Sequence, residues 1–206
     1  MSTSDFWDTK IKGLLRTDNV SGQTSNDMAF LYNFVKTHGF TKVLEIGMAD
    51  GMSSIPILLA MSENTASSSF KLTSIDSYQK SQWKSNGIKN LEVLGFSSNH
   101  ELIEDTDILA LPKLLEKGEK YDFIFIDGYH TFDHVLLNNF YADYLLNIDG
   151  FIINDDIWMP SIQRACSYIS KNYKHFKIDK ETYHRYGPIY KKTANKNINW
   201  NEFTSF

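Results

Sequence analysis

The sequence predicts an α/β fold in which a doubly wound, mostly parallel sheet of seven strands ends in a C-terminal antiparallel hairpin. Three observations support this prediction. Short runs rich in β-branched and aromatic residues alternate with stretches of helical period, which implies right-handed crossovers. Two of the runs are apolar almost throughout, which is typical of central parallel strands covered on both faces. After Tyr173 the pattern changes to two strand-like runs around a Gly-Pro turn.

Seven segments are expected to form the strands of this sheet. The five parallel strands are expected at residues 42–47, 71–76, 100–104, 121–127 and 151–154. The two hairpin strands are expected within residues 175–192, on either side of Tyr186-Gly187-Pro188. The hairpin would then close one edge of the sheet.

Three helices are indicated by apolar residues that recur every three or four positions. Their apolar stripes are Met28, Leu31, Tyr32 and Val35; Leu137, Phe140, Tyr141, Tyr144, Leu145 and Ile148; and Ile162, Ala165, Cys166, Ile169 and Tyr173. The first helix is entered through Thr24-Ser25-Asn26, and Thr131 is expected to cap the second, which Asp149-Gly150 ends. Pro160 lies in the first turn of the third helix. Cys166 is expected in the core and not as a nucleophile.

Composition restricts the class of protein. The 206 residues are expected to form a single domain, 1–206. The net charge of −4 argues against a nucleic-acid partner, and no apolar run approaches the roughly 20 residues that cross a membrane. The single cysteine and the lack of a secretory signal favour a cytoplasmic location. Lysines crowd residues 171–196, as a solvated basic face or as a patch for an anionic substrate.

Ligands of doubly wound sheets bind outside the carboxyl ends of the strands, so the residues at each strand end are the candidates. Gly47 and Gly51 follow the first strand and allow a tight turn with close approach to a ligand. Their spacing lacks the glycine fingerprint of dinucleotide enzymes, and the turn by itself is equally compatible with a simple connection. Ser53 and the free N–H groups of the next helix could hold an anionic group such as a carboxylate.

The second and third strand ends also carry acids. Asp76 could accept hydrogen bonds from both hydroxyls of a ribose, or it could cap the next helix. Asp105 and Thr106, followed by Asp107, could meet an adenine edge or cap the helix after them. The residues alone leave both pairs of alternatives open.

The fourth and fifth strand ends bring three carboxylates to the same edge of the sheet. These are Asp127, Asp155 and Asp156. Without a partner, three converging carboxylates raise one another's pKa, and a divalent cation would resolve that repulsion. Oxygen ligands without a cysteine pair or histidine cluster favour Mg²⁺, with Mn²⁺ and Ca²⁺ as alternatives. The competing interpretation is a set of separate helix caps and solvated loop acids.

The five strand ends together resemble the class I, S-adenosylmethionine (SAM)-dependent O-methyltransferases of the metal-dependent, catechol-methylating type. The similarity covers about residues 24–156 and is carried by LEIGMADGMSS, TSIDSY, EDTDIL, DFIFIDGYH and INDDI, in that order. The bacterial macrolide-sugar O-methyltransferases resemble the chain more closely still. The resemblance implies a Rossmann-like class I methyltransferase domain, in which the helical segment 1–40 contributes to the cofactor and acceptor sites.

The resemblance also implies a role for each candidate residue. Those implied to bind the cofactor are Thr24, Glu45, Gly47, Gly51, Ser53, Asp76, Asp105, Thr106 and Asp127, and the implied metal ligands are Asp127, Asp155 and Asp156. Within the cofactor, Glu45, Gly47, Gly51 and Ser53 would hold the methionine portion, with Thr24 near its carboxylate. Asp76 would bind the ribose, and Asp105 with Thr106 would flank the adenine.

Two departures from the catechol enzymes bear on the substrate. His130 replaces their lysine three residues after the first metal ligand, and Asp156 replaces their asparagine, as in the sugar-type relatives. The expected acceptor is therefore a small molecule with a metal-chelated hydroxyl, such as a sugar or vicinal diol. His130 is expected to be the general base, although it could instead cap the helix or orient Asp127.

Several other questions stay open at this point. Rival functions are a metal-dependent hydrolase that uses the same carboxylates and a catalytically silent methyltransferase-like subunit. A homodimer is one expected assembly. Trp7, Trp158, Tyr183 and His184 are candidate walls of the acceptor pocket, with plain aromatic packing as the alternative.

Overall fold

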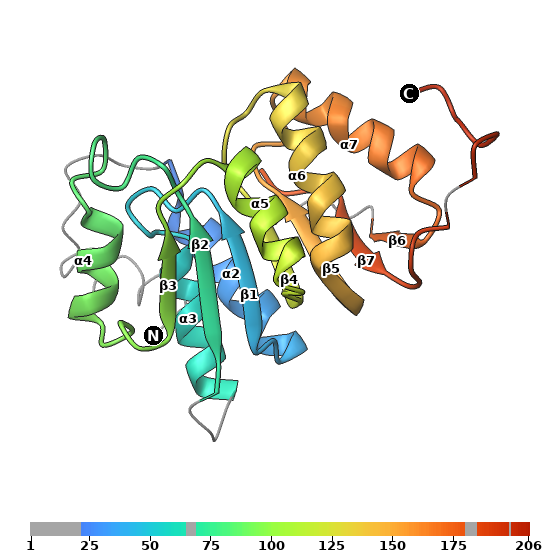
Figure 1. Ribbon diagram of the computed structural model, residues 1–206. Helices are drawn as coiled ribbons and strands as arrows, with labels where there is room; N and C mark the ends of the chain where they lie inside the picture. The colour runs from blue at the N-terminus through green and yellow to red at the C-terminus, as the bar shows by residue number, and fades with distance from the viewer. Residues whose placement is uncertain (1–21, 65–68, 180–184, 198) are drawn as a thin grey trace. The chain divides into compact units, whose positions relative to one another are not determined.

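The computed structural model describes residues 22–64, 69–179, 185–197 and 199–206 (Figure 1). The strands are β1 Lys42–Ile46, β2 Lys71–Ile75, β3 His100–Ile103, β4 Tyr121–Ile126, β5 Leu146–Asn154, β6 Phe176–Asp179 and β7 Ile189–Lys192. The helices are α2 Ser25–His38, α3 Ser54–Asn64, α4 Asn86–Val93, α5 Asp107–Glu116, α6 Phe132–Leu145 and α7 Pro160–Asn172.

The seven strands form one sheet in the order β3-β2-β1-β4-β5-β7-β6. The strand pairs β2–β3, β1–β4 and β4–β5 are parallel, whereas β7 runs antiparallel to both β5 and β6. Strands and helices alternate along the chain up to α7. The predicted fold class, including the C-terminal antiparallel hairpin, is confirmed.

The chain divides into two compact units, which are described separately. The first comprises the described part of Met1–Lys42 together with Met48–Glu104. In it α2 packs against α3, and α3 contacts β2. Helix α2 begins with a capping box in which Thr24 and Asp27 bond to each other's backbone N–H, and it ends at the left-handed Gly39. Of the apolar stripe predicted for this helix, Met28, Leu31 and Val35 are buried, whereas Tyr32 is only half-buried.

The second unit comprises Val43–Gly47 and Asp105–Phe206. Helices α5, α6 and α7 pack against one another in succession, and α6 also contacts β4 and β5 (Figure 1). Helix α7 starts at Pro160 and buries the predicted stripe, including Cys166. Burial raises the pKa of the Cys166 thiol to about 12, which makes it a core residue and not a nucleophile, as expected.

The boundary between α6 and β5 differs from the prediction. Thr131 is the N-cap residue as predicted, but the helix ends at Leu145, and β5 already begins at Leu146. The dipeptide Asp149-Gly150 was expected to end the helix, and it lies instead inside β5. There the register with β4 shifts, and Asp149 adopts a positive φ of 65°. Asp and Gly tolerate left-handed backbone in a strand irregularity as well as at a helix end, so the dipeptide alone does not decide between them.

The buried face of α6 also differs from the predicted stripe. Phe140 and Ile148 are exposed, whereas the buried residues of the helix include Asn138, Asn139 and Asp143. Asn139 exchanges amide hydrogen bonds with Asn154 of β5 at 2.8 and 3.2 Å. Paired polar side chains can occupy a core at little cost, so an apolar stripe alone misplaces this face.

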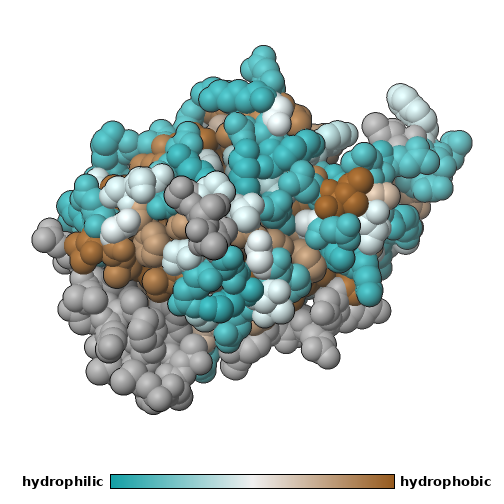
Figure 2. Space-filling model, turned by 90° about the horizontal axis from the view of Figure 1, so that it is seen from below, coloured by the Kyte–Doolittle hydropathy of each residue, from teal (hydrophilic) through white to brown (hydrophobic). Residues whose placement is uncertain are grey.

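The surface carries scattered hydrophobic residues. In Figure 2, hydrophobic residues on the visible face lie among hydrophilic ones. Exposed large hydrophobic side chains of this kind are ordinary in globular proteins. In the described ranges, no helix combines the length and the apolar character needed to cross a membrane.

Candidate active site

The end of β1 touches the backbone that follows β4. Gly47 has a φ of 91°, and a Cβ atom built on it would lie 2.0 Å from the carbonyl oxygen of Asp127. The Asp127 N–H donates to the Ile46 carbonyl at 2.8 Å, which fixes this close approach. Gly47 is therefore required by the packing of two strand ends as well as by its backbone conformation.

Gly47→Ala should destabilise the protein by about 3 kcal/mol, because the added methyl group collides with backbone and not with a movable side chain. The matched control is Gly118→Ala, which has a similar φ of 71° and open space around the new Cβ. That control should cost only about 1 kcal/mol. Chemical denaturation would measure both; equal losses would contradict the proposed contact.

The turn after β1 is tied to the end of β2 within the first unit. The Asp76 carboxylate accepts hydrogen bonds from the backbone N–H groups of Met48 at 3.1 Å and Ala49 at 2.7 Å. It also accepts from the Tyr78 N–H at 2.8 Å and the Gln79 side chain at 3.1 Å. Asp76 is buried and orders the glycine turn. These bonds to the turn after β1 go beyond a helix cap, and the next helix, α4, begins only at Asn86.

The other cofactor candidates of the first unit have distinct surroundings. Gly51 has a φ of 84°, and its N–H closes a turn onto the Met48 carbonyl at 2.9 Å. Ser53 is buried immediately before α3. The Thr24 hydroxyl donates to Asp27 at 2.7 Å, so in this structure it serves the helix cap.

The residues that follow β3 lead into helix α5 of the second unit. Thr106 is the N-cap residue of α5, and Asp105 accepts from the Thr106 N–H at 2.9 Å and from Lys113 at 2.8 Å. The buried Asp107 accepts from His134 at 2.8 Å. Thr106 occupies the N-cap position without a side-chain capping bond, so the helix-cap alternative and the contact with adenine both stay predictions.

The ends of β4 and β5 bring the catalytic candidates together. Ile126 pairs in register with Asn154, so Asp127 and Asp155 follow at neighbouring positions. His130 Nε2 lies 3.3 Å from Asp127 Oδ1 and 3.4 Å from Asp156 Oδ2. Asp127, His130 and Asp156 offer ligand atoms that all lie within 4.8 Å of one another. Glu45 is fully buried in β1, and its charge helps to raise the pKa of Asp127.

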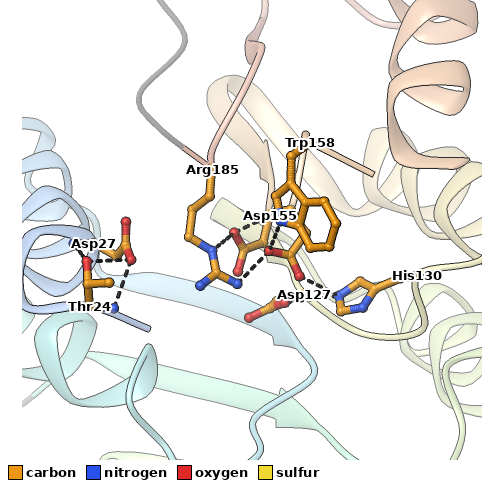
Figure 3. A network of polar contacts seen from close by, with 8 residues as sticks. Thr24, Asp27, Asp127, His130, Asp155, Trp158 and Arg185 are labelled. Atoms are coloured by element: carbon orange, nitrogen blue, oxygen red, sulfur yellow. Dashed lines mark hydrogen bonds and ion pairs between the residues drawn. The ribbon is translucent and has the colours of Figure 1, made fainter. Parts of the chain in front are cut away.

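Arg185 is the residue of this site that the sequence did not reveal. Its guanidinium donates from Nε to Asp155 Oδ1 and from Nη2 to Asp156 Oδ1, both at 2.6 Å (Figure 3). The Trp158 indole N–H also donates to Asp156 Oδ1, at 3.0 Å. Arg185 was one arginine among seven lysines in the basic segment. A single arginine among lysines could have indicated a partner with two carboxylates, because a guanidinium group binds paired carboxylates better than an ammonium group does.

The electrostatics of the cluster follow from burial. Burial is the largest cause of the raised pKa of both Asp127 and Asp155, and the charges of neighbouring acids add to it. Arg185 opposes this shift at both carboxyl groups. The repulsion among these acids was expected to be relieved by a divalent cation. The structure supplies part of that relief from within the chain.

The side chains that face one another could hold a divalent cation, but they are not the three carboxylates that were predicted. Two carboxylates and an imidazole face one another, and the carboxylate oxygens are ligands that Mg²⁺ or Mn²⁺ accepts. The group that the structure brings together contains His130 in place of Asp155, whose side chain is fully buried against Arg185. The ligand set Asp127, Asp155 and Asp156 thus stays a prediction, and the geometry favours Asp127 and Asp156 as ligands, with His130 beside them.

The basic segment makes contacts within its own unit. Lys191 pairs with Asp149 at 2.8 Å, and the buried Lys192 pairs with Asp143 at 3.3 Å. Lys196 lies 4.0 Å from the ring centre of Tyr173, and Lys171 donates to the Ser205 carbonyl. Four of the lysines thus have partners within the chain, and the choice between a solvated basic face and an anionic-substrate patch stays open. Of the predicted pocket walls, Trp158 is exposed beside the cluster, and Trp7, Tyr183 and His184 lie outside the described residues.

A family model described as a methyltransferase domain matches residues 44–157, which is more than half of the chain. The chain belongs to this methyltransferase family. The matched range includes every predicted strand end from β1 to β5, with Asp127, His130 and Asp156 among its residues. No curated protein matches the chain.

Solved structures share the fold of this methyltransferase. An O-methyltransferase from Bacillus cereus in complex with SAH has a TM-score of 0.70 at 17% identity, over 91% of this chain and 94% of that one. TomG from Streptomyces achromogenes is an O-methyltransferase involved in tomaymycin synthesis, solved in complex with SAM. It has a TM-score of 0.71 at 16% identity, over 84% of this chain and 82% of that one.

Proposed function

We propose that this methyltransferase transfers a methyl group from SAM to a hydroxyl oxygen of a small molecule, with a sugar or vicinal diol as the acceptor class. The observation that carries the proposal is the cluster of Asp127, His130 and Asp156 in a chain of the methyltransferase family. The structural relatives described as O-methyltransferases support oxygen as the accepting atom. His130 and Asp156, at the positions that distinguish the sugar-type enzymes, support the acceptor class.

In the proposed reaction the acceptor oxygen forms a bond to the methyl carbon while the bond from that carbon to sulfur breaks. The hydroxyl proton passes to His130, whose Nε2 points into the carboxylate cluster. A divalent cation held by Asp127 and Asp156 would lower the pKa of a chelated hydroxyl. The protein's main contribution would be alignment of the two reactants.

The acceptor class has its own test. Purified protein would be incubated with SAM, Mg²⁺ and separate panels of sugars, vicinal diols and catechols, and formation of SAH would be followed. Turnover of sugars or diols in preference to catechols is expected. Preferential turnover of catechols would overturn the assigned acceptor class. A protein that binds SAM but methylates no hydroxyl compound in any of the three panels would favour the silent-subunit alternative.

Cofactor binding should depend on Asp76. Calorimetry should show SAM and SAH binding with micromolar dissociation constants, which corresponds to about −8 kcal/mol. Asp76→Ala should weaken both by at least about tenfold. The carboxylate orders the Met48–Ala49 backbone through two hydrogen bonds, and it is also the predicted partner of the ribose.

The matched control for Asp76 is Glu101→Ala, which removes an exposed carboxylate of β3 that pairs with Lys71 at 3.4 Å. This variant should bind SAM as the wild type does. Tight binding of NAD together with no response to SAM or SAH would refute the proposed cofactor. A hydrolase that used the same acids would also show no thermal shift with SAM.

A further inference from the structure

Arg185 holds the carboxylate cluster from the side opposite His130 (Figure 3). It reaches two acids at once, Asp155 and Asp156, with 2.6 Å hydrogen bonds from two different guanidinium nitrogens. Its own carbonyl accepts from the Ile157 N–H at 2.8 Å, so backbone and side chain are fixed to the same turn. Arg185 is therefore held against the strand end and is not a surface residue that meets the acids by chance.

The oxygens of the two acids are used differently. Asp156 Oδ1 accepts from Arg185 and Trp158, which leaves Oδ2 facing His130. Asp155 Oδ1 accepts from Arg185 and from the Asp156 N–H at 2.7 Å. The Asp155 side chain is fully buried, whereas those of Asp156 and His130 are 11% and 35% exposed. Only part of the acidic cluster is thus presented to a ligand.

We infer that Arg185 is a positioning residue that pairs with Asp155 as an internal counter-ion, excludes it from the ligand set and leaves Asp127 and Asp156 to bind the cation beside His130. The inference rests on the proposed function insofar as that function includes a cation. It goes further because it assigns a role to a residue of the C-terminal hairpin region and changes which acids bind the metal.

The net charge of the cluster predicts how each substitution changes the affinity for the cation. The Arg185–Asp155 pair is nearly neutral, so the cation would be attracted by Asp127 and Asp156 alone. Removal of Arg185 exposes one more negative charge, and removal of Asp155 leaves one unpaired positive charge. Removal of both restores the original balance. A true metal ligand behaves otherwise, because its loss cannot be compensated by removal of an arginine.

The experiment is a double-mutant cycle read by Mn²⁺ binding, with full-length protein at pH 8. Arg185→Met should bind Mn²⁺ at least tenfold more tightly than the wild type, and Asp155→Asn at least threefold more weakly. The double variant should return to within about threefold of the wild type. Arg185→Lys, which keeps the charge, should also stay within about threefold. The control Arg164→Met removes an arginine of α7 that lies over the Phe206 ring and should change nothing.

Thermal unfolding in excess chelator gives a second readout that needs neither metal nor activity. Arg185→Met should lower Tm, because it leaves a buried carboxylate without its partner, and Asp155→Asn in the same chain should recover at least half of the loss. A simple loss of packing at Arg185 would not be recovered by a change at Asp155.

The outcomes separate the inference from the proposed function. If the double variant binds Mn²⁺ as weakly as Asp155→Asn or more weakly, Asp155 is a ligand and the inference is wrong. If Arg185→Met binds Mn²⁺ no more tightly than the wild type, the counter-ion role is wrong. If the wild type binds no Mn²⁺, the cation in the proposed function is overturned, and the Tm cycle alone then decides whether Arg185 is the counter-ion of Asp155.

Discussion

Replacing His130 by alanine should lower kcat by roughly 10²- to 10⁴-fold, the usual effect of losing a general base, while the affinity for SAM hardly changes. The reason is its position: Nε2 lies between Asp127 and Asp156 at 3.3 and 3.4 Å, where an acceptor hydroxyl bound to the cluster would have to lose its proton. Steady-state kinetics with saturating metal at pH 7.5, together with calorimetry for SAM, would measure both quantities.

Two further variants sharpen the test of His130. His130→Lys should recover part of the rate, because lysine occupies this position in the catechol-type enzymes. His38→Ala, an exposed histidine of α2, should leave kcat unchanged. A near-normal kcat for His130→Ala would place the base elsewhere. A large loss of Mn²⁺ affinity in the same variant would instead identify His130 mainly as a ligand.

Removing divalent cations with a chelator should reduce methyl transfer to the background rate, and Mg²⁺ or Mn²⁺ should restore it. Without a cation the acceptor hydroxyl keeps its ordinary pKa and is a poor nucleophile at neutral pH. Asp127→Ala should imitate the chelator and should not be rescued by added metal. Asp127 lies at the end of β4 and belongs to the group of facing donors. SAM-dependent product formation before and after dialysis would measure the effect.

The control for this prediction is Asp133→Ala, which removes an acidic side chain from the first turn of α6. It should retain full activity and full metal dependence. Undiminished turnover in excess chelator would refute the role of a cation. The carboxylates would then act with Arg185 as a metal-free anchor for the acceptor.

Much of the fold and part of the site could be predicted from local patterns. The strand β4 is apolar almost throughout, and the structure places it inside the sheet between β1 and β5. Parallel strands carry their C-terminal residues to a common edge, so Asp127 and Asp155 could be expected as neighbours before the structure was known. This inference needs only the direction of the strands and not their exact ends.

The remainder depended on contacts that no local pattern contains. Arg185 reaches the cluster from a distant segment in which the lysines obscured it. The inner face of α6 was misjudged because buried polar residues of the helix find tertiary partners. Asn139 pairs with Asn154, and Asp143 Oδ1 pairs with Lys192, although the other carboxylate oxygen of Asp143 has no hydrogen-bond partner among the described residues. The choice between a helix end and a strand irregularity for Asp149-Gly150 was made by pairing with β4. In each case a contact with a residue distant in the sequence decided the structure, and no local pattern predicts such a contact.

The reciprocal amide pair between Asn139 and Asn154 has a consequence for how this protein can change in evolution. Asn154 immediately precedes Asp155, and its pairing with Asn139 fixes the register of β5 relative to α6. The pair thereby determines which residue of the chain lies in the carboxylate cluster. A change at one asparagine leaves the other amide buried without its partner, which lowers fitness before any compensating change arrives. Homologous sequences should therefore alter the two positions together or not at all. The pair restricts the paths by which α6 can be remodelled while the methyltransferase stays active.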